Sequence, residues 1–154
     1  MKKISFTKGF SLIELMVVIA IIALLTALIT SNFAQSKAKS RDGKRISDLA
    51  QIQLSLELFF DRCNGYPTSL DIAQTLPSCP NDQNGTQINL GYFISKIPTD
   101  ISTNASYDYA VTNGVDYILG TQLEKDNATL QDSATGTLLG HTCGQDKYYC
   151  VKPK

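Results

Sequence analysis

The chain has 154 residues, enough for one domain, and its 14 basic and 14 acidic side chains give a formal net charge of zero. This balance excludes a strongly basic nucleic-acid-binding protein, and the single histidine, His141, excludes a histidine-rich metal site. Four cysteines in a small, otherwise polar domain predict two disulfides and an oxidising compartment.

The segment of residues 1–9 is short and basic. The segment of residues 10–29 is apolar except for Ser11, Glu14 and Thr26. At about 1.5 Å per residue, this apolar segment would form a helix about 30 Å long, which is the thickness of a hydrocarbon core. An ordinary signal peptide is the alternative, but its apolar region is shorter and ends at a small-residue cleavage site, which Ala34 and Ala38 provide poorly. Glu14 needs a partner, because a lone carboxylate in lipid costs roughly 3 kcal/mol.

The apolar periodicity continues beyond residue 30. Spacings of three and four residues connect Ile46, Leu49, Ile52, Leu56 and Phe59. We therefore expect one helix over residues 11–62, whose first half faces lipid or a fibre core and whose second half packs on a sheet. Asn64 and Gly65 form a helix stop signal, and Pro67 prevents the helix from resuming.

Five basic residues follow the apolar segment: Lys37, Lys39, Arg41, Lys44 and Arg45. Counted alone they would place this flank in the cytoplasm, whereas the expected disulfides place it outside, and we give the disulfides precedence. Such a run can bind nucleic acid or anionic lipid headgroups. Because no aromatic residues interleave it, a solvated helix face or contacts between subunits are favoured.

A proline-rich loop is expected over residues 66–87, followed by strands over residues 88–94, 107–111, 115–119, 137–139 and 148–151. Asn113 and Gly114 mark a hairpin turn. A three-residue loop over residues 112–114 pairs Val111 with Val115 and keeps the apolar side chains together. We expect this face to cover the helix and Asp116 to face solvent.

Residues 8–14 resemble the class III signal of type IV pilins and type II secretion pseudopilins. The shared elements are a short basic leader, Gly9, the aromatic first mature residue Phe10, and an acid at the fifth mature position, Glu14. The resemblance is specific over residues 8–25 and weaker up to residue 67. It implies an α+β fold in which a long N-terminal helix, hydrophobic in its first half and amphipathic in its second, packs on a small antiparallel sheet.

This resemblance divides the chain into a leader (residues 1–9), a transmembrane or fibre-core helix half (10–30), an amphipathic helix half (31–62) and a disulfide-stapled head (63–154). It implies that prepilin peptidase cuts between Gly9 and Phe10 and methylates the new Phe10 amine. Glu14 would then pair with the Phe10 amine of a neighbouring subunit, which supplies its missing partner. Before assembly the chain would cross the inner membrane once, with the head outside the cytoplasm and in contact with the inner-membrane assembly platform.

The four cysteines allow three pairings. The two local closures, Cys63–Cys79 and Cys143–Cys150, are expected: the first ties the helix exit to the connecting loop. The second makes a small C-terminal loop like the D-region of pilins.

The resemblance implies a structural subunit, identical or related copies of which polymerise into a type IV pilus-like extracellular fibre. A pseudopilin of a periplasmic type II secretion pseudopilus is the alternative. The disulfides disfavour it, as does the absence of the tryptophan-containing stretch near which major pseudopilins bind calcium. A minor pilin that binds DNA or a surface is a second alternative.

No enzyme, cofactor or metal site is expected. The residues Asp100, Asp108, Asp116 and Asp126 do not have the spacing of a calcium loop. His141 lies near Cys143, but the cysteine spacing is not that of a zinc site, and exported thiols oxidise.

Overall fold

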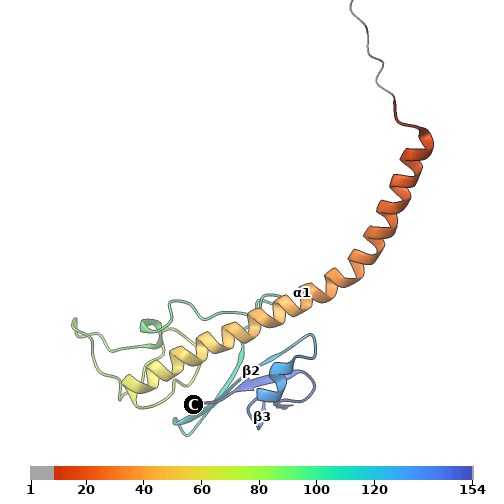
Figure 1. The fold of residues 1–154 in the computed structure, drawn as a ribbon. Helices are drawn as coiled ribbons and strands as arrows, with labels where there is room; N and C mark the ends of the chain where they lie inside the picture. The colour runs from red at the N-terminus through yellow and green to blue at the C-terminus, as the bar shows by residue number, and fades with distance from the viewer. Residues whose placement is uncertain (1–8, 154) are drawn as a thin grey trace, which may run out of the picture. The chain divides into compact units, whose positions relative to one another are not determined.

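The computed structural model describes residues 9–153, except for the side chains of residues 28–32. The chain divides into two compact units, Met1–Lys37 and Ala38–Lys154. Helix α1 runs over Leu12–Cys63 (Figure 1), as the periodicity predicts. Apart from Gly9, the predicted leader lies outside the described residues.

The head contains five short strands and two 3₁₀ helices. The elements after α1 are η1 (Leu90–Tyr92), β1 (Asp108–Thr112), β2 (Asp116–Gln122), η2 (Ala128–Asp132), β3 (Thr137–Leu138), β4 (His141–Thr142) and β5 (Tyr148–Val151). One antiparallel sheet has the order β1-β2-β5, and β3 pairs with β4. The predicted α+β class, with a long helix and a small antiparallel sheet, is confirmed.

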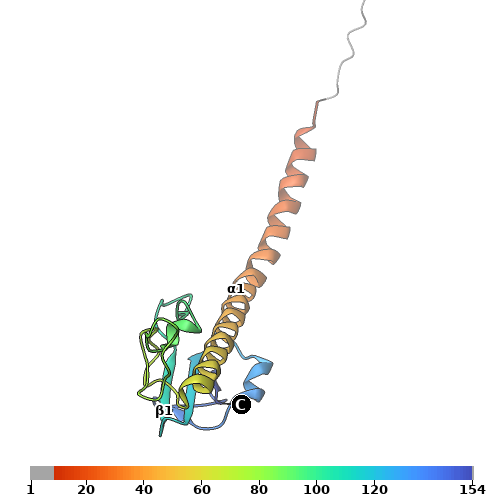
Figure 2. The same cartoon turned by 90° about the vertical axis from the view of Figure 1, so that its left-hand side faces the viewer.

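The second half of α1 packs on one face of the three-stranded sheet (Figure 2). Leu49, Ile52, Leu56 and Phe59 have no exposed surface and share a cluster with sheet residues that include Tyr117 and Leu119. These four helix residues are the ones that the spacing predicts. Their burial removes most of the apolar stripe from water, with Ile46 partly buried at its start, and fixes the helix on the sheet.

A smaller apolar cluster lies on the face of the sheet opposite α1. Leu138 of β3, Tyr148 and Cys150 of β5, and Cys143 are buried together, with Ile118 of β2 packed against them. Even-numbered residues of β2 therefore face the β3–β4 hairpin, and odd-numbered residues face the helix. The sheet is covered by apolar side chains on both faces.

The predicted hairpin register is wrong by two residues. The structure pairs Thr112 with Asp116 and Val111 with Tyr117. Asn113 and Gly114 both have positive φ, 54° and 72°, and the Val115 N–H donates to the Thr112 carbonyl at 3.3 Å, which closes a tight two-residue turn. Val115 is then an extra residue before the ladder resumes, a bulge that leaves it 62% exposed.

A shift of two residues keeps every side chain on its original face. Tyr117 and Leu119 are therefore fully buried against α1, and Asp116 is exposed, as expected. Val111 is half-buried against the same cluster. Only Val115 leaves the predicted face.

The strand predicted over residues 88–94 is also wrong, because Leu90–Tyr92 form the 3₁₀ helix η1. The Leu90 and Gly91 N–H groups donate to the carbonyls of Gln74 and Ile72, at 2.8 Å each, so this segment is tied to the preceding loop. Leu90 and Ile94 are both buried, at the spacing of one helical turn.

The C-terminal strands are close to those expected: β5 has the predicted bounds, and β3 ends one residue early. Leu139 and Gly140 have φ of 48° and 88°, so they turn the chain into β4, which was not predicted. The two disulfides are Cys63–Cys79 and Cys143–Cys150, the expected local closures.

Alanine substitutions at two glycines should change the stability of the fold in opposite directions. A Cβ at Gly120 would lie 2.8 Å from Tyr148 Cε1 and 3.0 Å from Leu138 Cδ2, whereas a Cβ at Gly43 would meet nothing within 4 Å. Gly120→Ala should lower the free energy of unfolding by about 1–3 kcal/mol through overpacking. Gly43→Ala should raise it by up to about 1 kcal/mol, because alanine favours the helix. Denaturant unfolding of the full chain in detergent measures both, and a neutral Gly120→Ala would contradict the placement of Tyr148 over β2.

Candidate functional site: the N-terminal processing and assembly segment

The predicted cleavage residues lie directly before α1. Gly9, Phe10 and Ser11 are outside the helix, which begins at Leu12. The Phe10 side chain is 89% exposed. Exposed segments outside regular secondary structure are preferred sites of proteolysis, so this segment is accessible for cleavage between Gly9 and Phe10.

The described residues leave open space around Gly9. A Cβ built at this position meets nothing within 4 Å. A requirement for glycine here would therefore come from an enzyme that binds the segment.

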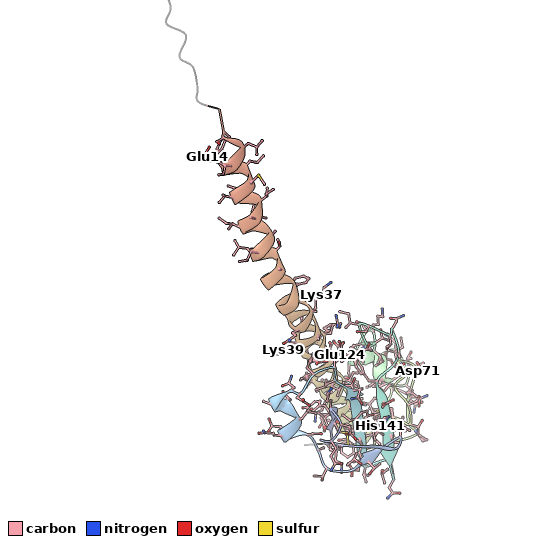
Figure 3. The ribbon with its side chains drawn as sticks, turned by 90° about the vertical axis from the view of Figure 1, so that its right-hand side faces the viewer. Glu14, Lys37, Lys39, Asp71, Glu124 and His141 are labelled. Carbon is pink, nitrogen blue, oxygen red and sulfur yellow. A yellow bond between two sulfur atoms is a disulfide. The ribbon has the colours of Figure 1, made fainter. Side chains whose placement is uncertain are left out.

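Glu14 stabilises the start of α1. The backbone N–H of Ser11 donates to Glu14 Oε2 at 2.9 Å, and Glu14 is the third residue of the helix (Figure 3). This contact is one half of a capping box, and a carboxylate in the first turn also interacts favourably with the helix dipole. The capping role was not predicted, although the Ser11-x-x-Glu14 spacing is its sequence signature.

The side chains after Glu14 are apolar and exposed. The fractional exposures are between 48% and 76% for Leu12, Ile13, Leu15, Met16, Val17, Val18, Ile19, Ile21, Ile22, Leu24 and Leu25. A contiguous apolar surface of this extent marks an interaction site. Within the described part of the chain, no helix is both long enough and apolar enough to cross a membrane.

The basic run after this segment is mostly neutralised by the head. Arg41 binds Glu124 through two contacts, Nε–Oε1 at 2.7 Å and Nη2–Oε2 at 2.5 Å. Arg45 donates to Asp42 at 2.8 Å, to Glu124 at 2.9 Å, and to Asp100. The Arg45 side chain is 6% exposed and that of Asp42 1% exposed. This network joins α1 to the loops that carry Asp100 and Glu124, whereas the sequence favoured a solvated helix face or contacts between subunits.

Further contacts extend the network. Asp42 also accepts the backbone N–H groups of Glu124 and Lys125, at 2.9 and 3.0 Å. Asp48 is buried and accepts from Lys44 and from the Tyr107 hydroxyl, the latter at 2.9 Å. Every carboxylate buried here therefore has a donor, as the desolvation cost requires.

The ion pairs lower the pKa values of two acidic residues in the network. The hydrogen bond from Arg45 holds the pKa of Asp100 well below its usual value, and the hydrogen bond from Arg41 lowers the pKa of Glu124 to about 2. The hydrogen bond to Asp100 raises the pKa of Arg45. Asp100, Glu124 and Arg45 are therefore charged at neutral pH.

His141 and Cys143 do not form a reactive pair. Cys143 is bonded to Cys150, and the His141 ring stacks on Tyr148 with centroids 4.5 Å apart and planes 15° apart. Both residues contribute to the packing of the C-terminal hairpins.

Comparisons with known proteins agree with this architecture. Residues 5–30 match the family model of the prokaryotic N-terminal methylation motif. The type II secretion system core protein G of Klebsiella pneumoniae is 32% identical over 94 residues, which are 60% of this chain and 67% of that protein. Core protein G of Escherichia coli strain K12 is 30% identical over 107 residues, 69% of this chain and 72% of that protein.

The type IV major pilin protein PilA of Myxococcus xanthus is 30% identical over 104 residues, 68% of this chain but 44% of that protein. No solved structure matches the chain. With its methylation motif, its long helix on an antiparallel sheet and its similarity to core protein G, the chain belongs to the family of type II secretion pseudopilins and type IV pilins.

Proposed function

We propose that the chain is a structural pseudopilin subunit of a type II secretion system. It is held in the inner membrane by residues 10–30, cleaved after Gly9, methylated on Phe10 and polymerised through α1 into a short periplasmic fibre. The similarity to core protein G over most of both chains carries this proposal. The pilus-like fibre favoured by sequence alone becomes the second candidate, supported by the similarity to PilA.

The two features that disfavoured a pseudopilin concern the stability of the head. Cys63–Cys79 ties the end of α1 to the connecting loop, and Arg45 ties α1 to the loops of Asp100 and Glu124. Disulfides and ion pairs can do the stapling that a bound cation does in other small domains. The presence of the disulfides and the absence of the tryptophan-containing stretch therefore do not distinguish a pseudopilus subunit from a pilus subunit.

The start of α1 supports the assembly role of Glu14. Ser11 occupies Oε2, and Oε1 accepts no hydrogen bond from the described residues. The carboxylate can thus cap its own helix and still accept the amine of a neighbouring Phe10. In a fibre interior that is shielded from water, such a pair removes two otherwise uncompensated charges.

Deletion of the gene tests the choice between fibres. The proposal expects loss of type II secretion of folded exoproteins, with surface pili and twitching intact. Complementation with the parent chain, or with the exposed-surface control Lys96→Gln, should restore secretion. Loss of pili with intact secretion would overturn the proposal in favour of the pilus. The chain's abundance in sheared fibres then separates a major pilin from a minor one that binds DNA or a surface.

A further inference from the structure

An aromatic residue and a lysine lie together at the far end of the apolar part of α1. Phe33 is 62% exposed, and Lys37 follows it by one helical turn, with its Nζ 5.5 Å from the Phe33 ring centroid. This is the geometry of a cation–π contact. Both side chains belong to the same compact unit and face the surroundings of the helix.

Lys37 differs from most of the basic run. Arg41, Lys44 and Arg45 are bound to carboxylates of the head or of α1. Among the described residues no carboxylate pairs with Lys37 or Lys39, which are labelled in Figure 3. Lys37 follows Phe33 by four residues and therefore lies on the same face of the helix.

With residues 10–30 held in the membrane, as proposed above, this pair would lie at the membrane surface. The rise from Leu12 to Phe33 is about 32 Å at about 1.5 Å per residue, close to the roughly 30 Å of a hydrocarbon core. Lys37 lies about 6 Å farther along the helix, at the depth of the headgroups. Aromatic residues gather at this level, and nearby lysines attract anionic lipids.

We propose that Phe33 and Lys37 form an interfacial anchor that binds the headgroups of anionic phospholipids. The anchor fixes the depth at which the subunit is stored, with the phenyl ring at the interface and the ammonium group on a lipid phosphate. It rests on the proposed function, because only a membrane-stored subunit would use it. Its partner is a lipid surface, which supplies the negative charge that the described residues do not provide for Lys37.

The chain has no tryptophan, so a single substitution creates a unique fluorescent reporter. Phe33→Trp preserves an exposed aromatic residue and should not disturb folding. The full mature chain is reconstituted in phosphatidylcholine vesicles, and quenching is compared for phosphatidylglycerol and phosphatidylcholine brominated near the top of the acyl chain, at equal mole fraction. We expect brominated phosphatidylglycerol to quench the tryptophan fluorescence as if it bound about fivefold more tightly than brominated phosphatidylcholine. This is the effect of one lysine near a lipid phosphate.

Two matched controls define the result. Adding Lys37→Gln should bring this preference down to about one, whereas adding Lys96→Gln, an exposed lysine of the head, should leave it unchanged. Leu54→Trp, in the second half of α1 at a position that is also 62% exposed, should be quenched by neither lipid. Equal quenching of the Phe33→Trp chain by both lipids, absence of quenching, or a preference that survives Lys37→Gln would overturn the anchor.

Secretion and fibre incorporation are scored for the same variants, so the anchor and the proposed function fail separately. Equal quenching with intact incorporation rejects the anchor alone. A clear phosphatidylglycerol preference in a chain that never enters a fibre supports the anchor and rejects the proposed function.

Discussion

Arg45→Met should lower the free energy of unfolding of the head by about 3–5 kcal/mol at neutral pH. The methionine fills much of the same space, but it leaves the carboxylates of Asp42, Asp100 and Glu124 without their shared cation. Removing one partner of a buried ion pair has a cost of this size because an uncompensated charge remains. Denaturant unfolding of the full chain in detergent measures the change.

The pH dependence separates lost charge pairing from lost packing. The pKa values of Asp100 and Glu124 are depressed in the folded state, to about 2 for Glu124, so their ion pairs stabilise the fold above the unfolded value near 4. This contribution is lost as the pH falls from about 4 toward the folded pKa values. The difference between the parent chain and Arg45→Met should therefore shrink in acid. A difference that stays constant with pH, or an Arg45→Met chain as stable as the parent, would contradict the network. As a control, Lys39→Gln replaces a lysine of the same helix that pairs with no carboxylate of the described residues, and it should change the free energy of unfolding by no more than about 0.5 kcal/mol.

Substitutions of Glu14 should leave membrane insertion intact or improved, because they remove a charge that is costly in lipid. Incorporation into fibres should fall by roughly two orders of magnitude or more for both Glu14→Ala and Glu14→Gln. Each leaves the neighbouring Phe10 amine unpaired, at about 3 kcal/mol or more. Recovery of the chain in purified fibres measures incorporation, and a normal yield from Glu14→Gln would reject the pairing.

The same two variants separate the cap from the charge pair. The side-chain amide oxygen that Glu14→Gln introduces can still accept the Ser11 N–H, whereas Glu14→Ala leaves no acceptor. Amide hydrogen exchange at the first turn of α1, in detergent micelles, should be near that of the parent in Glu14→Gln and faster in Glu14→Ala. Equal protection in all three chains would show that the carboxylate does not cap the helix.

Local patterns predicted much of the fold. The spacing from Ile46 to Phe59 is a helical period, and Asn64 and Gly65 end the helix where the structure ends it. The β2 alternation assigned Tyr117 and Leu119 to the buried face even though the register was displaced. Face assignment survives a two-residue shift, because side chains alternate with a period of two.

The errors arose where distant contacts decide the structure. Asn113-Gly114 is compatible with several loop lengths, and the pairing of Val111 with Tyr117, which leaves Val115 as a bulge, is not marked by any turn signal. Arg45 binds Asp100 and Glu124, which lie 55 and 79 positions further along the chain. The local sequence around Arg45 therefore shows only a run of basic residues. The capping contact of Glu14 is different, because the Ser11-x-x-Glu14 spacing that indicates it is present in the local sequence. It was missed because Glu14 had been assigned only a role in assembly.

Maturation as a pilin-like subunit can be read from the intact mass and the N-terminal sequence of the exported protein. We expect a chain that begins at Phe10, lacks residues 1–9 and carries one methyl group on its amine. We also expect that a bulky residue in place of Gly9 blocks this cleavage. A mature N-terminus beyond Ala34, produced by an ordinary signal peptidase, would contradict the account.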